Sequence, residues 1–125
     1  MSDLPPVDTF GKALSKLHEF TAAPIANDRD RAGVIQAFEF TFEQCWKAFR
    51  RIAAAQGTAA VSPRQALEAA VRLELIRADD EEAWLEMLRD RNMTSHLYQE
   101  TVALEIAQRV VDRYLGLLDE AHRKC

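Results

Sequence analysis

The sequence contains little glycine, proline or cysteine, and each shortage excludes a class of structure. Four Gly and four Pro occur in 125 residues, and two of the Pro lie within the first six. Because β-branched residues are also scattered, strands have little to build from. Two cysteines, Cys45 and Cys125, make neither a disulfide framework nor a spaced metal site. We therefore expect an all-α fold in a reducing compartment.

A basic excess and long apolar runs are also absent. The formal net charge is −4, whereas nonspecific phosphate binding usually shows as a basic excess. Any RNA contact must therefore be local, and no DNA binding is expected. No apolar run approaches the roughly 20 residues of a membrane span, and the N-terminus lacks a signal-peptide pattern. We expect a soluble cytoplasmic protein with no membrane association.

The apolar residues recur at helical spacing along one domain, residues 1–125, of which 1–6 are expected to be flexible. About five helices are predicted. The first begins after Pro6 with Asp8 or Thr9 as its cap and ends before Pro24, the second runs from Asn27 to Gly57, the third follows the cap Ser62, the fourth opens at 79–82, and the fifth follows Tyr98. The acidic run 79–82 suits a helix start, and its side chains diverge too much to hold a metal.

The second predicted helix is the scaffold of the fold. A core face is formed by Ile35, Phe38, Phe42, Cys45, Phe49 and Ile52. Phe40 and Trp46 fall outside this face, so more than one side of the helix must meet apolar surface. Two alternatives remain open, which are a central helix packed on both sides within one domain and an interface with a second subunit.

A polar stripe also follows this helix, from Glu39 through Glu43 to Lys47 and Arg50. Such a stripe is usually a solvated face, but Lys47 and Arg50 with Arg51 form a basic patch that could contact a phosphate. Arg64 could hold a phosphate at the start of the third helix, although a surface arginine beside a cap is the commoner case. Gln65 completes a capping box with Ser62.

The densest group of functional side chains lies in residues 91–98, between the fourth and fifth helices. On an uninterrupted helix Arg91, Ser95 and Tyr98 share one face, while His96 lies about 140° away from Arg91. Arg91 and His96 therefore need a helix break at residues 92–95 or a symmetric dimer if they are to act together. Otherwise they do different jobs.

If these side chains converge, they suit RNA cleavage without a metal. A neutral His96 can take a proton from a ribose 2′-OH or deliver one to the leaving oxygen, and Arg91 can stabilise charge on phosphate oxygens. Asn92, Ser95 and Tyr98 could add hydrogen bonds. The alternative is an arginine that bonds helix-end carbonyls and a histidine that caps or packs.

The order of motifs resembles a known family. It comprises residues 34–43, Trp46-Lys47, Ser62-Pro63-Arg64, Arg91-Asn92, Ser95-His96 and Tyr98, within about residues 31–114. This series is similar to the HEPN superfamily, to its HepT toxins and more closely to the nucleotidyltransferase substrate-binding proteins.

The resemblance implies an antiparallel up-and-down helical bundle that forms homodimers and assembles with a minimal nucleotidyltransferase antitoxin. For the toxins it implies an endoribonuclease site at the dimer interface, matched here by Arg91 and His96, and silencing by AMP transfer to the tyrosine matched by Tyr98. It implies no cofactor. A second hypothesis is a noncatalytic subunit that presents nucleotide or substrate to a partner nucleotidyltransferase.

Overall fold

The computed structural model describes residues 6–96 and 99–125, and it confirms the all-α prediction for them. The elements are α1 (Pro6–Thr21), α2 (Asp28–Ala55), α3 (Pro63–Arg72), the 3-10 turn η1 (Ala78–Asp80), α4 (Glu81–Met93), the 3-10 turn η2 (Thr94–His96), α5 (Glu100–Arg109), the π-helical segment η3 (Val110–Tyr114) and α6 (Leu115–Lys124). Within the described ranges no strand occurs, and no helix is long and apolar enough to cross a membrane.

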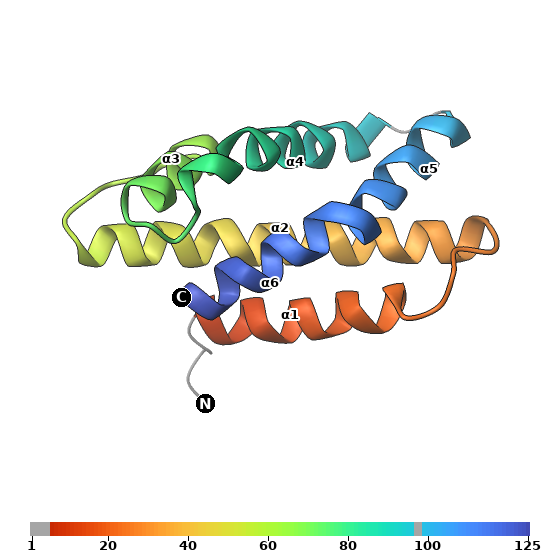
Figure 1. Cartoon of the computed structure of the whole chain (residues 1–125), viewed down its shortest axis with the longest axis horizontal. Coiled ribbons are helices and arrows are strands. Elements are labelled where there is room, and N and C mark those ends of the chain that lie inside the picture. The colour runs from red at the N-terminus through yellow and green to blue at the C-terminus, as the bar shows by residue number, and fades with distance from the viewer. Residues whose placement is uncertain (1–5, 97–98) are drawn as a thin grey trace.

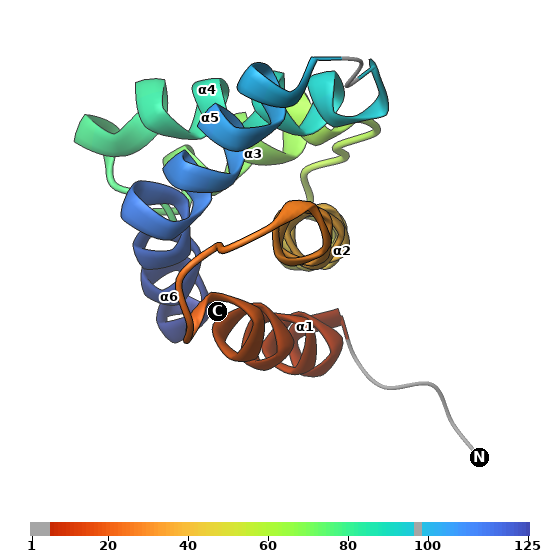
Figure 2. The ribbon, with the colours of Figure 1, turned by 90° about the vertical axis from the view of Figure 1, so that its right-hand side faces the viewer.

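The longest helix, α2, is the axis of the bundle (Figure 1). α1 packs along it, and α3, α4 and α5 also contact it. Viewed end-on in Figure 2, α2 has α1 below it, α3 to α5 above it and α6 to its left, while its right-hand side is uncovered by helices. Phe40 of α2 is 57% exposed. The described chain therefore packs around α2 without enclosing it.

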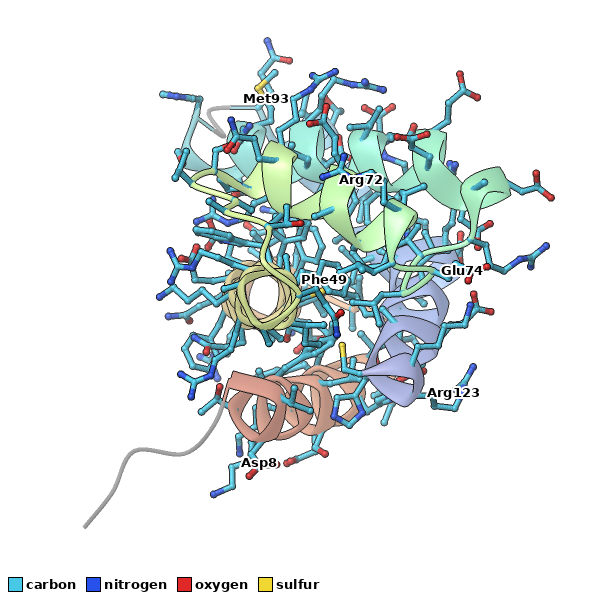
Figure 3. All side chains as sticks on the ribbon, turned by 90° about the vertical axis from the view of Figure 1, so that its left-hand side faces the viewer. Asp8, Phe49, Arg72, Glu74, Met93 and Arg123 are labelled. Carbon is cyan, nitrogen blue, oxygen red and sulfur yellow. The ribbon has the colours of Figure 1, made fainter. Side chains whose placement is uncertain are left out.

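The predicted core face of α2 is largely confirmed. Its phenylalanines and Cys45 are buried, and only Ile52 is half-buried. Phe49 points from α2 into the interior, whereas Asp8, Met93 and Arg123 lie at the periphery (Figure 3). The other large buried side chains include Phe10 and Trp84, which come from α1 and α4. One core therefore joins the helices on both sides of α2.

Helix starts follow the predicted caps at two of three places. The Asn27 side chain accepts a hydrogen bond from the Asp30 N–H at 2.8 Å, and the Ser62 hydroxyl accepts one from the Gln65 N–H at 3.2 Å. The expected cap at Asp8 or Thr9 is wrong, because α1 already begins at Pro6. Proline is tolerated in a first turn, where its missing N–H has no helical partner. Of the six residues expected to be flexible, 1–5 lie outside the described residues.

The predicted fifth helix is continuous but not regular, since α5 passes through the π-helical η3 into α6. The side chains that it buries most deeply, Ile106, Val110, Tyr114 and Leu118, are four residues apart. In a regular α-helix each such step drifts about 40° around the axis. The wider π turn offsets this drift and keeps the four side chains in the core. Leu118 is buried, whereas its neighbour Leu117 is only half-buried.

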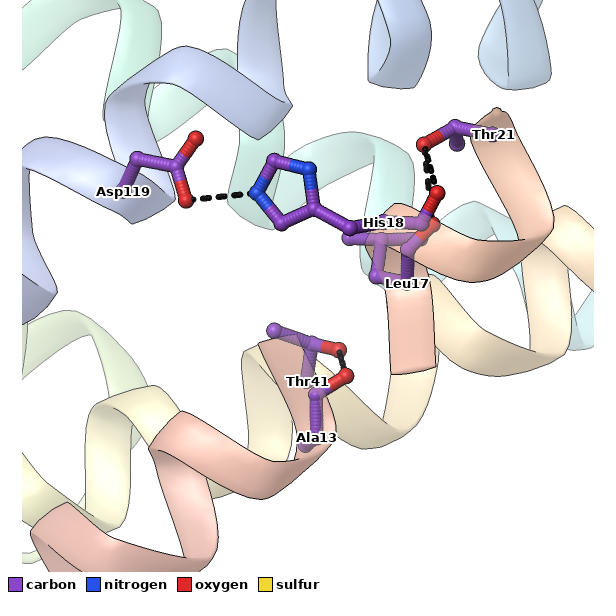
Figure 4. Close-up of polar contacts among 6 residues, drawn as sticks. All are labelled: Ala13, Leu17, His18, Thr21, Thr41 and Asp119. Carbon is purple, nitrogen blue, oxygen red and sulfur yellow. Dashed lines mark hydrogen bonds and ion pairs between the residues drawn. The ribbon is translucent and has the colours of Figure 1, made fainter. Parts of the chain in front are cut away.

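Polar contacts fix α1 against its neighbours (Figure 4). The Thr41 hydroxyl of α2 lies 3.1 Å from the carbonyl oxygen of Ala13 and 2.7 Å from that of Ala37. His18 Nε2 lies 2.8 Å from the Asp119 carboxylate of α6. These contacts tie together the helix pairs that frame the lower half of the bundle.

Candidate functional site

The α-helix ends within residues 92–95, and such a break is one of the alternatives that the sequence left open. The α-helix ends at Met93 and continues for one 3-10 turn to His96. The Thr94 hydroxyl donates a hydrogen bond to the Arg91 carbonyl at 2.6 Å. A threonine side chain can in this way compete with the backbone N–H groups for a helical carbonyl. The 3-10 turn is wound more tightly than the α-helix that precedes it.

This tightening keeps Arg91 and His96 on different sides of the helix end. With about 100° per α-helical residue and about 120° per 3-10 residue, His96 points about 160° from Arg91 around the shared axis. Helical geometry of this kind would not bring the two side chains together within one chain. The two residues flank the end of α4 from opposite directions.

Arg91 is held by Glu39 of α2. Its Nη1 lies 3.7 Å from Glu39 Oε2, and the same oxygen accepts a hydrogen bond from the Thr94 hydroxyl at 2.5 Å. The Arg91 side chain is 27% exposed, and at 3.7 Å the contact is an ion pair and not a hydrogen bond. The guanidinium therefore keeps N–H donors for an anionic ligand. Glu39 was expected in a solvated stripe, and its partners 52 and 55 residues away give no signal in sequence.

A hollow of about 350 Å³ lies beside this ion pair. Glu39 lines it together with Arg31, Ile35 and Gln36 of α2 and Ala103 of α5. Arg31 is paired with Asp28 at 3.1 Å. Arg31 therefore lines the hollow, and Arg91 is linked to it through its ion pair with Glu39, so this region holds two guanidinium groups that are each paired with a carboxylate.

The other motif residues face solvent. Asn92, Ser95 and His96 are exposed, and within the described residues their side chains have no hydrogen-bond partner. Tyr98 lies outside the described residues. His96 is thus available to a ligand or to another chain, and Asn92 and Ser95 are not used to build the fold.

A second polar cluster joins α4 to the helix that follows. Asp90 accepts hydrogen bonds from Arg109 Nε and Nη2 at 2.8 and 3.0 Å, and its Oδ2 also accepts one from the Tyr114 hydroxyl. Tyr114 is fully buried and stacks on Phe38, with ring centroids 5.7 Å apart. Burial, and then the hydrogen bond to Asp90, raise the pKa of Tyr114, and the bond to Asp90 raises the pKa of Arg109.

This Asp90 cluster has a positional consequence for the motif. Asp90 directly precedes Arg91, so the cluster fixes the last turn of α4 against η3. None of its members was predicted as a site residue from the sequence. Only the spacing of four residues around Tyr114 offers a signal, and it points to an irregular helix and not to a hydrogen bond.

The candidate phosphate contacts fall into two places. Lys47 and Arg50 line one surface hollow near the end of α2, together with Arg51. Arg64 does not line this hollow and is paired with Glu68 at 3.7 Å. The structure therefore groups Lys47 with Arg50 and separates Arg64 from them.

Cysteine and metal chemistry have little support in the part of the chain that the structure describes. No group of three His, Cys, Asp or Glu side chains there could hold a metal ion. Burial raises the pKa of the Cys45 thiol well above its ordinary value and that of Cys125 to about 11, so neither is a thiolate near neutral pH.

The helical architecture of this chain is shared with solved structures of other proteins. A protein from Thermus thermophilus is 31% identical and superposes with a TM-score of 0.84, over 92% of this chain and 97% of that chain. The tri-AMPylated HEPN toxin of Shewanella oneidensis, solved in complex with MNT antitoxin, is 19% identical with a TM-score of 0.78, over 98% and 96% of the two chains. A mutant toxin–antitoxin complex, MntA–HpeT, contains a chain 17% identical with a TM-score of 0.77, over 94% and 92%.

Residues 6–125 match the family described as nucleotidyltransferase substrate binding protein like, and the chain belongs to this family. The structural likeness to the HEPN toxins gives the fold, as the sequence motifs predicted. Comparison with curated proteins gives no match.

Proposed function

We propose that this protein is the toxin component of a pair with a minimal nucleotidyltransferase, and that it is a metal-independent endoribonuclease. The observation that carries the proposal is that the exposed His96 and the partly exposed Arg91 both lie at the end of α4. Both are accessible, and Arg91 keeps unused donors. Solved toxins of the same fold are in complex with MNT antitoxin, which supports the partner assignment.

The proposed reaction uses the 2′-OH of the RNA as nucleophile. His96 in its neutral form accepts the 2′-OH proton as the 2′-oxygen bonds to phosphorus, and the bond from phosphorus to the 5′-oxygen breaks as that oxygen takes a proton from water. Arg91 stabilises the negative charge that develops on the non-bridging phosphate oxygens. The products are a 2′,3′-cyclic phosphate and a free 5′-OH, so no metal or cofactor takes part.

In this proposal a homodimer brings Arg91 and His96 together from different subunits. In one chain Arg91 and His96 diverge by about 160° around the helix axis. Near them the uncovered side of the molecule exposes two large apolar side chains, Phe40 (57%) and Met93 (50%). A two-fold axis through this surface would bury both and bring Arg91 of one subunit towards His96 of the other.

Mixing inactive variants tests this arrangement directly. We expect Arg91→Ala and His96→Ala proteins to be inactive alone and to recover activity when mixed and allowed to exchange subunits. A random mixture regains about a quarter of the wild-type rate, because half of the dimers are mixed and each has one intact site. A mixture as inactive as its components would exclude a shared site.

The cleavage itself is tested with a matched control. His96→Ala should abolish RNA cleavage without changing dimer mass or melting temperature. His18→Ala removes a histidine whose side chain is paired with Asp119 of α6, and it should leave the rate of cleavage unchanged. Equal cleavage by wild type and His96→Ala would show that this histidine is not the acid or base.

The regulatory part of the proposal concerns Tyr98 and the partner enzyme. Tyr98 would accept AMP from the nucleotidyltransferase on its hydroxyl. Because Tyr98 is two residues from His96 in the sequence, the added AMP would block the binding of RNA. The Shewanella oneidensis toxin is tri-AMPylated, which supports this step. After coexpression with the partner, the intact mass should rise by AMP units, and Tyr98→Phe should remove at least one of them. An unchanged pattern of additions in Tyr98→Phe would assign the modification elsewhere.

A noncatalytic substrate-binding subunit is the second candidate, and the family description favours it. Arg91 and His96 would then serve as ligands to a nucleotide presented to the partner. Nucleotide binding by protein that cleaves none of several RNAs, with loss of that binding in Arg91→Ala, would support this function over the ribonuclease.

A further inference from the structure

A surface hollow of about 690 Å³ lies at the C-terminal end of α2, away from the Arg91 site. From α2 it is lined by Lys47, Arg50, Arg51 and the last-turn alanines Ala54 and Ala55, and from the following loop by residues 59–61. Its volume is in the range of small-molecule sites. Arg50 is eleven residues from Glu39, or about 16 Å along α2, so this hollow is separate from the proposed catalytic site.

The loop wall of the hollow is built by a helix-ending motif. Gly57 adopts φ +84°, its N–H bonds to the Ala54 carbonyl, and the Thr58 N–H bonds to the Ala53 carbonyl. This pattern reverses the chain over the last turn of α2. Ala60 is 5% exposed and anchors the returning segment in the core, while Val61 is 78% exposed. The apolar wall is therefore fixed by the fold.

Three cations of α2 line the hollow in a protein whose net charge is −4. Lys47 is paired with Glu43 at 3.5 Å, on a side chain that is 40% exposed, which is a weak surface ion pair. The guanidinium of Arg50 lies 4.9 Å from the Trp46 ring centre, which leaves its N–H edge free. Arg51 is exposed and has no ion-pair partner in the described ranges. The positive charge here is thus largely uncompensated.

We propose that this hollow binds a nucleoside phosphate, either a free nucleotide or a nucleotide of a single-stranded RNA. The phosphate contacts Arg50, Arg51 and Lys47, and the flat apolar base lies against the alanine wall and Val61. A wall of small side chains leaves room for a ring, whereas an acidic peptide would use the cations and leave this wall bare. The proposal does not depend on catalysis at Arg91 and His96.

The test is isothermal titration of the full-length protein with ATP, with tripolyphosphate and with a 2′-O-methyl oligoribonucleotide, which has no 2′-OH to attack. Arg50→Gln/Arg51→Gln should weaken ATP binding at least about tenfold through the loss of charge-assisted hydrogen bonds. The control Arg64→Gln/Arg72→Gln removes the same charge from exposed positions on α3, outside the hollow, and should bind as wild type.

A neutral substitution tests the apolar wall. Ala55→Leu fills the hollow without a change of charge, so it should weaken ATP but not tripolyphosphate. If the oligoribonucleotide binds and loses affinity in the arginine variant, the occupant is RNA. If only ATP binds and loses affinity in the arginine variant, the occupant is a free nucleotide.

Several results would overturn the proposal. They are equal ATP affinity in wild type and the arginine variant, equal loss in the control, or tighter binding of a hexaglutamate peptide than of any nucleotide. ATP binding that persists in His96→Ala while RNA cleavage is lost supports the hollow as a site of its own. Loss of ATP binding in His96→Ala would show instead that ATP binds at the catalytic site.

Discussion

The hydrogen bond from Tyr114 to Asp90 gives the sharpest energetic prediction. Tyr114→Phe keeps the ring, its stacking on Phe38 and its complete burial, and removes only the hydroxyl. A buried hydrogen bond to a charged acceptor contributes about 1.5–3 kcal/mol, so we expect the free energy of unfolding to fall by about that amount.

Asp90→Ala should cost about 1–4 kcal/mol. It leaves the buried Tyr114 hydroxyl without an acceptor, at about 1–3 kcal/mol, and removes the partner of Arg109. Arg109 is 33% exposed, so water replaces much of that ion pair and its loss adds at most about 1 kcal/mol. The double variant Asp90→Ala/Tyr114→Phe should be destabilised by about 1.5–2 kcal/mol less than the sum of the singles, because they share one hydrogen bond.

Urea denaturation followed by far-ultraviolet circular dichroism, at pH 7 and fixed protein concentration, measures these differences. Glu19→Gln is the control, because its ion pair with Lys16 is about two-thirds exposed on both sides and should contribute little. The reasoning fails if the two single effects are strictly additive, or if Tyr114→Phe costs no more than Glu19→Gln.

Three further predictions concern stability. Gly57→Ala should cost about 1–2 kcal/mol in the same assay, because φ is +84° there, and no loss would mean that the turn can rearrange. Gly11→Ala places a methyl group 2.8 Å from His122 Nε2 and should cost about 1–3 kcal/mol, and adding His122→Ala should recover much of it in thermal melts. Because the pKa of Tyr114 is raised, its neutral form stabilises the fold fully below about pH 10, and this contribution is lost as pH rises through the folded value. Wild type should therefore lose more stability above pH 10 than Tyr114→Phe, and parallel pH profiles would contradict this assignment.

The helices could be predicted from the sequence because their signals are local. The caps at Asn27 and Ser62 act over three residues, and the core face of α2 repeats every three or four. The start of α1 was placed too late for the same reason, since Asp8 suits both a cap and a first turn.

The partners of the candidate site could not be predicted, because they depend on how helices cross. Asp90 meets Arg109 and Tyr114 at separations of 19 and 24 residues, and Glu39 meets Thr94 at 55. These residues are of types that are common on protein surfaces. Their pairing can be recognised only once the packing of α4 against α2 and η3 is known. The sequence left a break after Arg91 open as one alternative, but it could not show that α4 ends in a 3-10 turn at Thr94–His96.

The π turn at residues 110–114 also constrains how this family can change. It behaves as one extra residue in an otherwise regular helix, so its removal would rotate α6 by about 100° relative to α5. Leu118 and Ala121 would leave the core that they share with α1 and α2. A single-codon deletion here is therefore equivalent to repacking one whole side of the bundle, whereas the same deletion in the loop before α3 would shorten only a connection. Insertions and deletions among relatives should accordingly collect in the loops and avoid this turn.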